Sequence, residues 1–148
     1  HKELFHKEKE LNLIKTKLSP EENLRDITDR NFLIWSTIAK GMKIKIDFIL
    51  QPVGSWCQKK LSKEEEKLFE EEDNSERQRF NKYVDRNKYE LYKNISKESA
   101  NKNSINFLDC NEIFNDKYFS KKWLFLNRFH LTDLANKYVA ETLIKKIF

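Results

Sequence analysis

The chain has 148 residues, which is enough for one domain with a buried core. Hydrophobic residues make up 39% of it and aromatic residues 13%, so a folded domain is expected rather than a disordered chain. The 29 Lys and Arg residues exceed the 24 Asp and Glu residues by a net charge of +5, but they alternate with acidic residues and form no basic stripe. We therefore expect no nucleic-acid-binding function.

Glycine and proline are scarce, with two of each, and this scarcity favours long helices with few tight turns. It also excludes the GxGxxG loop, the Walker phosphate loop and the GxSxG elbow, which need glycines at fixed spacings. No apolar run reaches the roughly 18 residues of a transmembrane helix, so we expect no membrane span in this segment. Cys57 and Cys110 stand far apart, which fits free thiols better than a disulfide scaffold.

The first half of the chain begins with two expected helices. Residues 1–18 carry apolar side chains at helical spacing along one face. Ser19, Pro20 and Glu22 then form the pattern of a helix start, with Ser19 as cap and Glu22 closing a capping box. We expect this second helix to run to about Lys40 and Gly41 to terminate it.

A strand and a charged helix should follow. Residues 42–50, MKIKIDFIL, alternate and then become continuously apolar, which predicts a buried strand that ends before Pro52 and Gly54. Residues 61–73 open with a second capping box, Ser62 with Glu65. Their acidic residues, Glu64–Glu66 and Glu70–Glu72, are expected to form a solvated helix face.

The second half predicts a long helix over about 75–99, a short strand at 105–109 and an aromatic loop at 111–131. Asp109, at the end of that strand, fits a turn former better than a catalyst. The last helix should begin after the cap Thr132 with Asp133 in its first turn, where a negative charge suits the helix dipole.

Strands that alternate with helices indicate a parallel sheet covered by helices. Two strands are too few for such a sheet, because their open edges would be unpaired. We therefore expect further strands, from segments not recognised here or from another chain. A helical interaction protein with no sheet is the alternative architecture.

His130 is a candidate for chemistry, because it lies in a loop that follows a strand and precedes a helix; the alternative is a loop histidine that only caps or packs. In open α/β sheets, active sites gather at the carboxyl ends of the strands. A metal site is not expected, since His1 and His6 are five residues apart and no third ligand joins them. Trp56 and Trp123 are candidates to line a cleft for an acyl or sugar group.

The segment NRFHLTDLANKYVAETL, residues 127–143, resembles the C-terminal block of the SGNH (GDSL-type) hydrolases. That block has the pattern Asp-x-x-His, commonly followed by Leu-Thr-Asp-x-Gly-Asn and a terminal helix. The matching residues are His130, Leu131, Thr132, Asp133 and Asn136, whereas Ala135 replaces the usual Gly. The order of the earlier elements agrees, so the resemblance covers about residues 20–148.

This resemblance implies a helix-rich α/β fold, the C-terminal part of a three-layer α/β/α sandwich with parallel strands. It also implies ester hydrolysis by a serine nucleophile, acting on a small-molecule or carbohydrate ester without a cofactor. His130 corresponds to the general base, and Asn127 stands where the family has the orienting Asp. An amide there is expected neither to hold the required imidazole tautomer nor to stabilise an imidazolium as a carboxylate does.

The Gly-Asp-Ser block of the family nucleophile and the oxyanion blocks are absent from the sequence. Four of its serines, Ser36, Ser55, Ser62 and Ser120, lie in no such motif. The resemblance therefore implies that residues 1–148 form a single partial domain, which carries the base and lacks the nucleophilic half. Alone it should not hydrolyse esters. The alternative is a non-catalytic SGNH-like binding domain.

Overall fold

The computed structural model describes residues 18–76 and 81–147. The helix expected over residues 1–18 therefore lies almost entirely outside the described residues. The described helices and strands are, in chain order, α2 (Pro20–Met42), β1 (Asp47–Leu50), α3 (Lys63–Asp73), the 3-10 helix η1 (Arg86–Lys88), α5 (Tyr89–Lys102), β2 (Asn106–Asp109), the 3-10 helices η2 (Asn111–Asn115) and η3 (Lys117–Phe119), and α6 (Asp133–Ile147).

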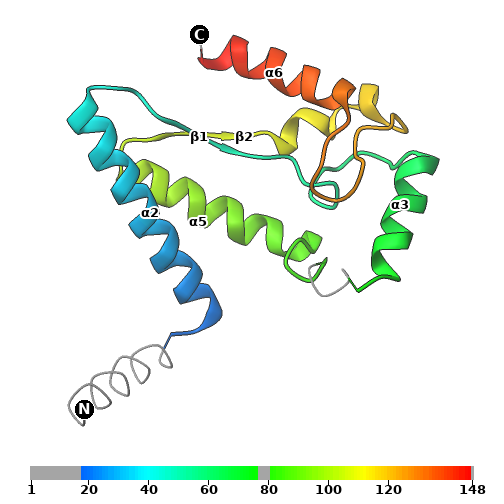
Figure 1. The fold of residues 1–148 in the computed structure, drawn as a ribbon, viewed down its shortest axis with the longest axis horizontal. Coiled ribbons are helices and arrows are strands. Elements are labelled where there is room, and N and C mark those ends of the chain that lie inside the picture. The colour runs from blue at the N-terminus through cyan, green and yellow to red at the C-terminus, as the bar shows by residue number, and fades with distance from the viewer. Residues whose placement is uncertain (1–17, 77–80, 148) are drawn as a thin grey trace.

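The two strands form a parallel pair, as the sequence predicts (Figure 1). Asp47 pairs with Asn106 and Leu50 with Asp109, so both strands end at the same edge. The crossover between them contains α3, η1 and α5. The chain is thus a mixed α/β structure with mostly helical elements, and the interpretation as a helical protein without a sheet is wrong.

One face of the strand pair is covered by helices. α5 contacts both strands and α2 packs on α5, while α6 lies on the other side of the strands in Figure 1 and contacts η2. The buried side chains of Phe32, Ala100 and Ile105 form the core of this helix–sheet layer. Phe48 of β1 and Phe107 of β2 pack against it with their rings stacked, 6.0 Å apart.

A second core lies beyond the carboxyl ends of the strands. It contains four completely buried side chains: Phe114 of η2, Leu124 and Phe125 of the following loop, and Ala135 of α6. Phe69 of α3 packs with them. The ring of Phe114 meets that of Phe125 edge to face, with 5.9 Å between the centroids. This core supports the segment that leads to His130.

Local capping signals predict where three helices begin. The Oγ of Ser19 accepts the N–H of Glu22 at 3.2 Å, and the Glu22 carboxylate accepts the N–H of Ser19 at 2.7 Å. Ser62 and Glu65 form the same reciprocal pair at the start of α3, and Thr132 Oγ1 accepts the N–H of Ala135 at 3.3 Å. The sequence-based predictions of these helix starts are confirmed.

Three element boundaries differ from the predictions. α2 runs past Gly41 to Met42, because Lys43 adopts the left-handed conformation (φ 56°) that ends the helix. The N–H of Ile44 bonds to Ala39 O, so residues 43–46 form the helix exit and the strand spans only 47–50. The long helix expected over about 75–99 includes residues 77–80, which lie outside the described residues. α5 itself begins at Tyr89, after the separate 3-10 turn η1, which Asp85 caps by accepting the N–H of Asn87.

The prediction for the acidic helix is wrong at Glu65 and only partly right at Glu72, whose side chain is 13% exposed and lies against Arg128. Glu64, Glu66 and Glu70 are exposed as expected, whereas Glu65 is completely buried and ion-paired with Lys59. Within residues 18–76 and 81–147, no helix combines the length and the apolar character that crossing a membrane requires.

Candidate functional site

His130 belongs to a tight hairpin that connects the loop after η3 with α6. Phe125 forms an antiparallel bridge with Leu131. The N–H of Leu126 donates to His130 O at 2.8 Å, and that of Thr132 donates to Leu124 O at 2.9 Å. Because Leu124 and Phe125 are completely buried, the base of the hairpin is fixed while its tip reaches the surface.

Arg128, at the tip, anchors the hairpin to the rest of the molecule. Its carbonyl accepts the N–H of Gly54, in the loop after β1, at 2.8 Å. Its guanidinium donates to both carboxylate oxygens of Asp73 at 2.7 and 2.8 Å. The backbone N–H of Arg128 donates to the Glu72 carboxylate at 3.2 Å. These contacts connect the hairpin to the end of α3 and to the carboxyl end of β1.

Asn111 joins the loops that follow the two strands. Its buried side-chain oxygen accepts the N–H of Val53 at 2.8 Å, and its Nδ2 donates to Gln51 O at 3.1 Å. Asp109 in turn accepts the N–H of Asn111 at 2.9 Å, as a turn-forming aspartate does. The carboxyl edge of the sheet and the hairpin therefore form one hydrogen-bonded unit, with His130 at its surface.

The structure brings His130 and Asn127 together. The imidazole Nδ1 lies 2.9 Å from Asn127 Oδ1, which also accepts the N–H groups of Phe129 (2.9 Å) and His130 (2.8 Å). His130 is exposed and Asn127 is half-buried. Among the described residues, no hydroxyl or thiol is hydrogen-bonded to the ring.

Three of the serines that lie in no nucleophile motif are also engaged elsewhere in the structure. The hydroxyl of Ser36 donates to Asn103 O at 2.9 Å, that of Ser55 donates to Val84 O, and Ser62 caps α3. The two cysteines are buried and free. Burial raises the pKa of the Cys57 thiol to about 12 and also raises the pKa of Cys110, which disfavours a nucleophilic thiolate at either position.

A charged group that the sequence analysis missed lies at the carboxyl end of β2. The hydroxyl of Tyr89 donates to Asp109 Oδ2 at 2.5 Å, and Lys93 donates to Glu112 at 2.6 Å while lying 3.4 Å from Asp109. Burial and the Asp109 carboxylate raise the pKa of Tyr89, so its hydroxyl stays protonated. The spacing of Tyr89 and Lys93, four residues apart on one helix, was the available signal.

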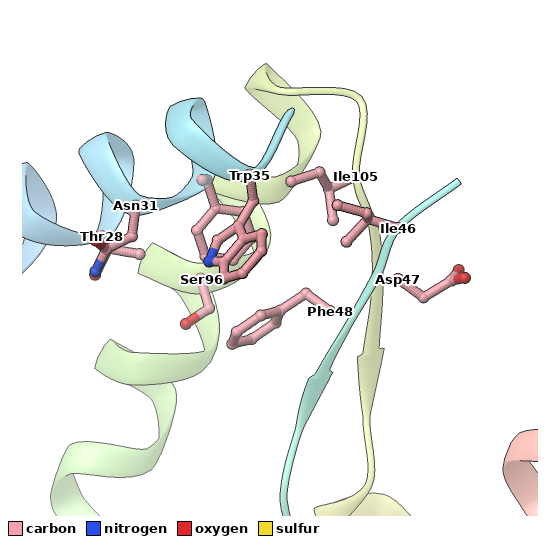
Figure 2. A pocket seen from close by; sticks show the side chains of 9 residues that line it. Thr28, Asn31, Trp35, Ile46, Asp47, Phe48, Ser96 and Ile105 are labelled. Atoms are coloured by element: carbon pink, nitrogen blue, oxygen red, sulfur yellow. The ribbon is translucent and has the colours of Figure 1, made fainter. Parts of the chain in front are cut away.

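The structure places an open cavity of about 720 Å³ between α2, α5 and β1. In Figure 2, Trp35 of α2, Phe48 of β1 and Ser96 of α5 surround it. It lies towards the amino-terminal end of β1, and no residue of the His130 hairpin lines it. This cavity is therefore separate from the candidate site.

The expectation that Trp56 lines a cleft is wrong. Its side chain is 6% exposed and packs against Tyr89 and Tyr92, while its Nε1 donates to Asp85 O at 3.2 Å. Trp123 is 45% exposed, and its Nε1 donates to Phe125 O at 2.9 Å. Of the two, only Trp123 is available at the surface near the hairpin.

His1 and His6 lie outside the described residues. Across the described ranges, no three or more His, Cys, Asp or Glu side chains are grouped as a metal ion would require. No protein-family model matches the chain, and a search of curated proteins finds no match. The geometry of the hairpin is therefore the main evidence on function.

Proposed function

We propose that this chain carries the catalytic-base portion of a serine ester hydrolase of the SGNH (GDSL) type, with His130 as the general base. The observation that carries the proposal is the pairing of His130 Nδ1 with Asn127 Oδ1 at 2.9 Å, on a surface hairpin at the carboxyl edge of two parallel strands. The spacing of these two residues matches the family pattern, and so does the helix α6 that follows.

The proposed reaction is attack of a serine hydroxyl on the carbonyl carbon of an ester. Nε2 of His130 removes the hydroxyl proton as the serine oxygen bonds to carbon, and returns it to the alcohol that leaves. Water then attacks the acyl-enzyme while Nε2 of His130 removes its proton, and the acid is released as the serine regains a proton. The serine comes from outside residues 18–76 and 81–147, since no described hydroxyl reaches the ring.

This proposal includes the three-layer architecture of the family. Further parallel strands would extend the β1–β2 pair into a larger sheet, with helices on both faces. Two features support this. Residues Asp47–Leu50 pair on one edge only within the described part of the chain, and none of the eight strand residues is fully buried, although parallel sheets are normally covered on both faces.

The test uses the protein as its own cells produce it. A fluorophosphonate probe labels a serine that a base activates, and hydrolysis of p-nitrophenyl butyrate reports turnover. We expect His130→Gln to abolish labelling and to lower hydrolysis by at least about 10²-fold, because general-base catalysis contributes about that much or more. His6→Gln, the matched histidine control, should change neither. Labelling and hydrolysis that survive His130→Gln would rule out the proposed base.

A non-catalytic SGNH-like binding domain is the second candidate, favoured by the neutral side chain at Asn127. The two candidates differ in the response to Asn127→Asp. If neither the natural protein nor this variant hydrolyses esters or reacts with the probe, the binding domain is supported. A gain of hydrolysis in the variant supports the enzyme.

A further inference from the structure

The side-chain amide of Asn127 has only one orientation that the hairpin accepts. Its Oδ1 receives the backbone N–H groups of Phe129 at 2.9 Å and of His130 at 2.8 Å. An amide nitrogen is a donor and cannot accept either bond. A flipped amide would place its NH₂ group against two N–H donors, so the backbone itself decides which atom is the oxygen, an assignment that is otherwise ambiguous.

This orientation determines which nitrogen of His130 carries the proton. The same Oδ1 lies 2.9 Å from Nδ1. A carbonyl oxygen only accepts, so Nδ1 must be the donor, and the neutral ring then has a bare Nε2. In a neutral histidine, the hydrogen bond made by one ring nitrogen determines whether the other nitrogen carries the proton. We propose that Asn127 is a positioning residue that locks His130 in the Nδ1–H tautomer.

The inference reverses the expectation drawn from the sequence, that an amide cannot hold this tautomer. In a well-studied serine protease, replacing the orienting Asp by Asn lowers kcat by about 10⁴ and leaves the imidazole in the wrong tautomer. The wrong tautomer there means that the amide turns its NH₂ group to the ring. In this hairpin the N–H groups of Phe129 and His130 prevent that rotation.

Asn127 therefore keeps one function of a carboxylate and lacks the other. It holds the ring of His130 so that the Nε2 lone pair can remove a proton. It has no negative charge to stabilise the imidazolium that forms when Nε2 takes that proton. For the catalytic part, which rests on the proposed function, we expect Asn127→Asp to raise ester hydrolysis by about 10-fold to 100-fold. That gain is smaller than 10⁴ because the correct tautomer is already present.

Nitrogen NMR tests the tautomer on the chain itself, without substrate. Long-range proton–nitrogen spectra at alkaline pH distinguish a protonated ring nitrogen from a bare one. His130→Gln identifies the signals among the three histidines. We expect the Nδ1–H form in the natural chain and in Asn127→Asp. A natural chain that is mainly in the Nε2–H form would overturn the proposal.

The variant Asn127→Ser distinguishes the effect of Asn127 on the His130 tautomer from its role in holding the turn together. Its shorter side chain can still accept the backbone N–H groups of the turn, but it does not reach Nδ1. We expect the backbone amide shifts of residues 129 and 130 to stay close to the natural ones while the ring changes to mainly Nε2–H. Retention of the Nδ1–H form in this variant would also overturn the lock.

The two proposals fail separately. A locked tautomer in a protein that neither hydrolyses esters nor reacts with fluorophosphonate would leave the lock standing and remove the hydrolase. If hydrolysis depends on His130 but the ring is not held in the Nδ1–H form, the hydrolase proposal would stand and the tautomer lock would be removed.

Discussion

Lys59 and Glu65 form an ion pair in which both side chains are completely buried. The Glu65 carboxylate is saturated, since Oε2 also accepts the N–H of Ser62 at 2.7 Å and Oε1 accepts those of Leu124 and Phe125 at 2.9 and 3.1 Å. One side chain thus joins the start of α3 to the base of the His130 hairpin.

Removing this carboxylate should destabilise the fold strongly. Glu65→Ala leaves the buried Lys59 ammonium with no carboxylate and only the Lys60 carbonyl to bind, and it leaves three backbone N–H groups without their acceptor. Loss of one member of a buried pair costs about 3–5 kcal/mol. We expect a decrease of that size in the free energy of unfolding, measured by urea denaturation followed by circular dichroism.

Glu66→Ala is the matched control, because Glu66 is the exposed neighbour on the same helix. It should change the free energy of unfolding by less than about 0.5 kcal/mol. Equal effects of the two substitutions would mean that the Glu65 network contributes no more than a surface charge.

Gly54 is required for close packing beneath the hairpin. A Cβ atom there would overlap the ring of Phe69 and lie 3.4 Å from Cγ of Phe125. Because both rings are buried, they cannot turn aside freely. We expect Gly54→Ala to lower the free energy of unfolding by about 1–3 kcal/mol, as overpacking in a core does, measured by urea denaturation.

Gly41 gives the contrast to Gly54. It lies inside α2, where a Cβ atom would meet nothing within 4 Å. Gly41→Ala should raise the free energy of unfolding by about 0.5–1 kcal/mol, because alanine loses less backbone entropy in a helix. A loss of stability in this variant would show that the helix end needs glycine after all.

The amide of Asn111 should be needed to hold the two strand ends together. Asn111→Ala leaves the N–H of Val53 and the carbonyl of Gln51 without their side-chain partner. A buried polar group left unsatisfied costs about 1–3 kcal/mol. We expect thermal unfolding at a correspondingly lower temperature, whereas the exposed Asn101→Ala should unfold nearly as the natural chain does.

The buried thiol of Cys57 predicts a specific alkaline response. Burial raises its pKa to about 12, above the roughly 8.5 of an unfolded cysteine. The folded state therefore binds this proton more tightly. The resulting stability is complete below about pH 8.5 and is lost as the pH rises towards 12. We expect the urea midpoint to fall across this window.

Cys57→Ala should make the alkaline decrease of the urea midpoint smaller, because it removes the titrating thiol. Alkylation gives a second measure, since iodoacetamide reacts with the thiolate. In the folded protein at neutral pH the reaction should be slow, and it should become fast in urea. Fast alkylation of Cys57 in the folded protein would contradict the burial of its thiol.

Signals carried by neighbouring residues predicted much of the fold. The capping boxes at Ser19 and Ser62 and the cap at Thr132 are complete within four residues of sequence, so they predicted helix starts correctly. The existence of two apolar strands was also predicted correctly, although the first is shorter than expected, and their parallel pairing followed from their alternation with helices.

Positions set by distant contacts could not be predicted. Glu65 has the sequence context of a solvated acidic residue, and its burial depends on Lys59 and on residues 124–125, about sixty positions away. Trp56 is buried because Tyr89 and Tyr92 of α5 pack against it. The end of α2 was misplaced because Lys43, rather than glycine, adopts the left-handed conformation.

The candidate site lies between these two cases. Asn127 and His130 are three residues apart, so their proximity followed from the sequence pattern alone. The orientation of the amide did not follow from it, because that depends on where the N–H groups of Phe129 and His130 point. When the backbone direction determines which way a side-chain amide points, that orientation can be known only from the three-dimensional structure.

The hairpin also has a consequence for protein engineering. The contact that orients His130, and the two N–H groups that orient Asn127, lie entirely within residues 127–130. The Phe125–Leu131 bridge closes the segment with a short antiparallel pairing. The proposed tautomer lock would therefore need only the four residues 127–130, once a designed scaffold holds them in the same turn.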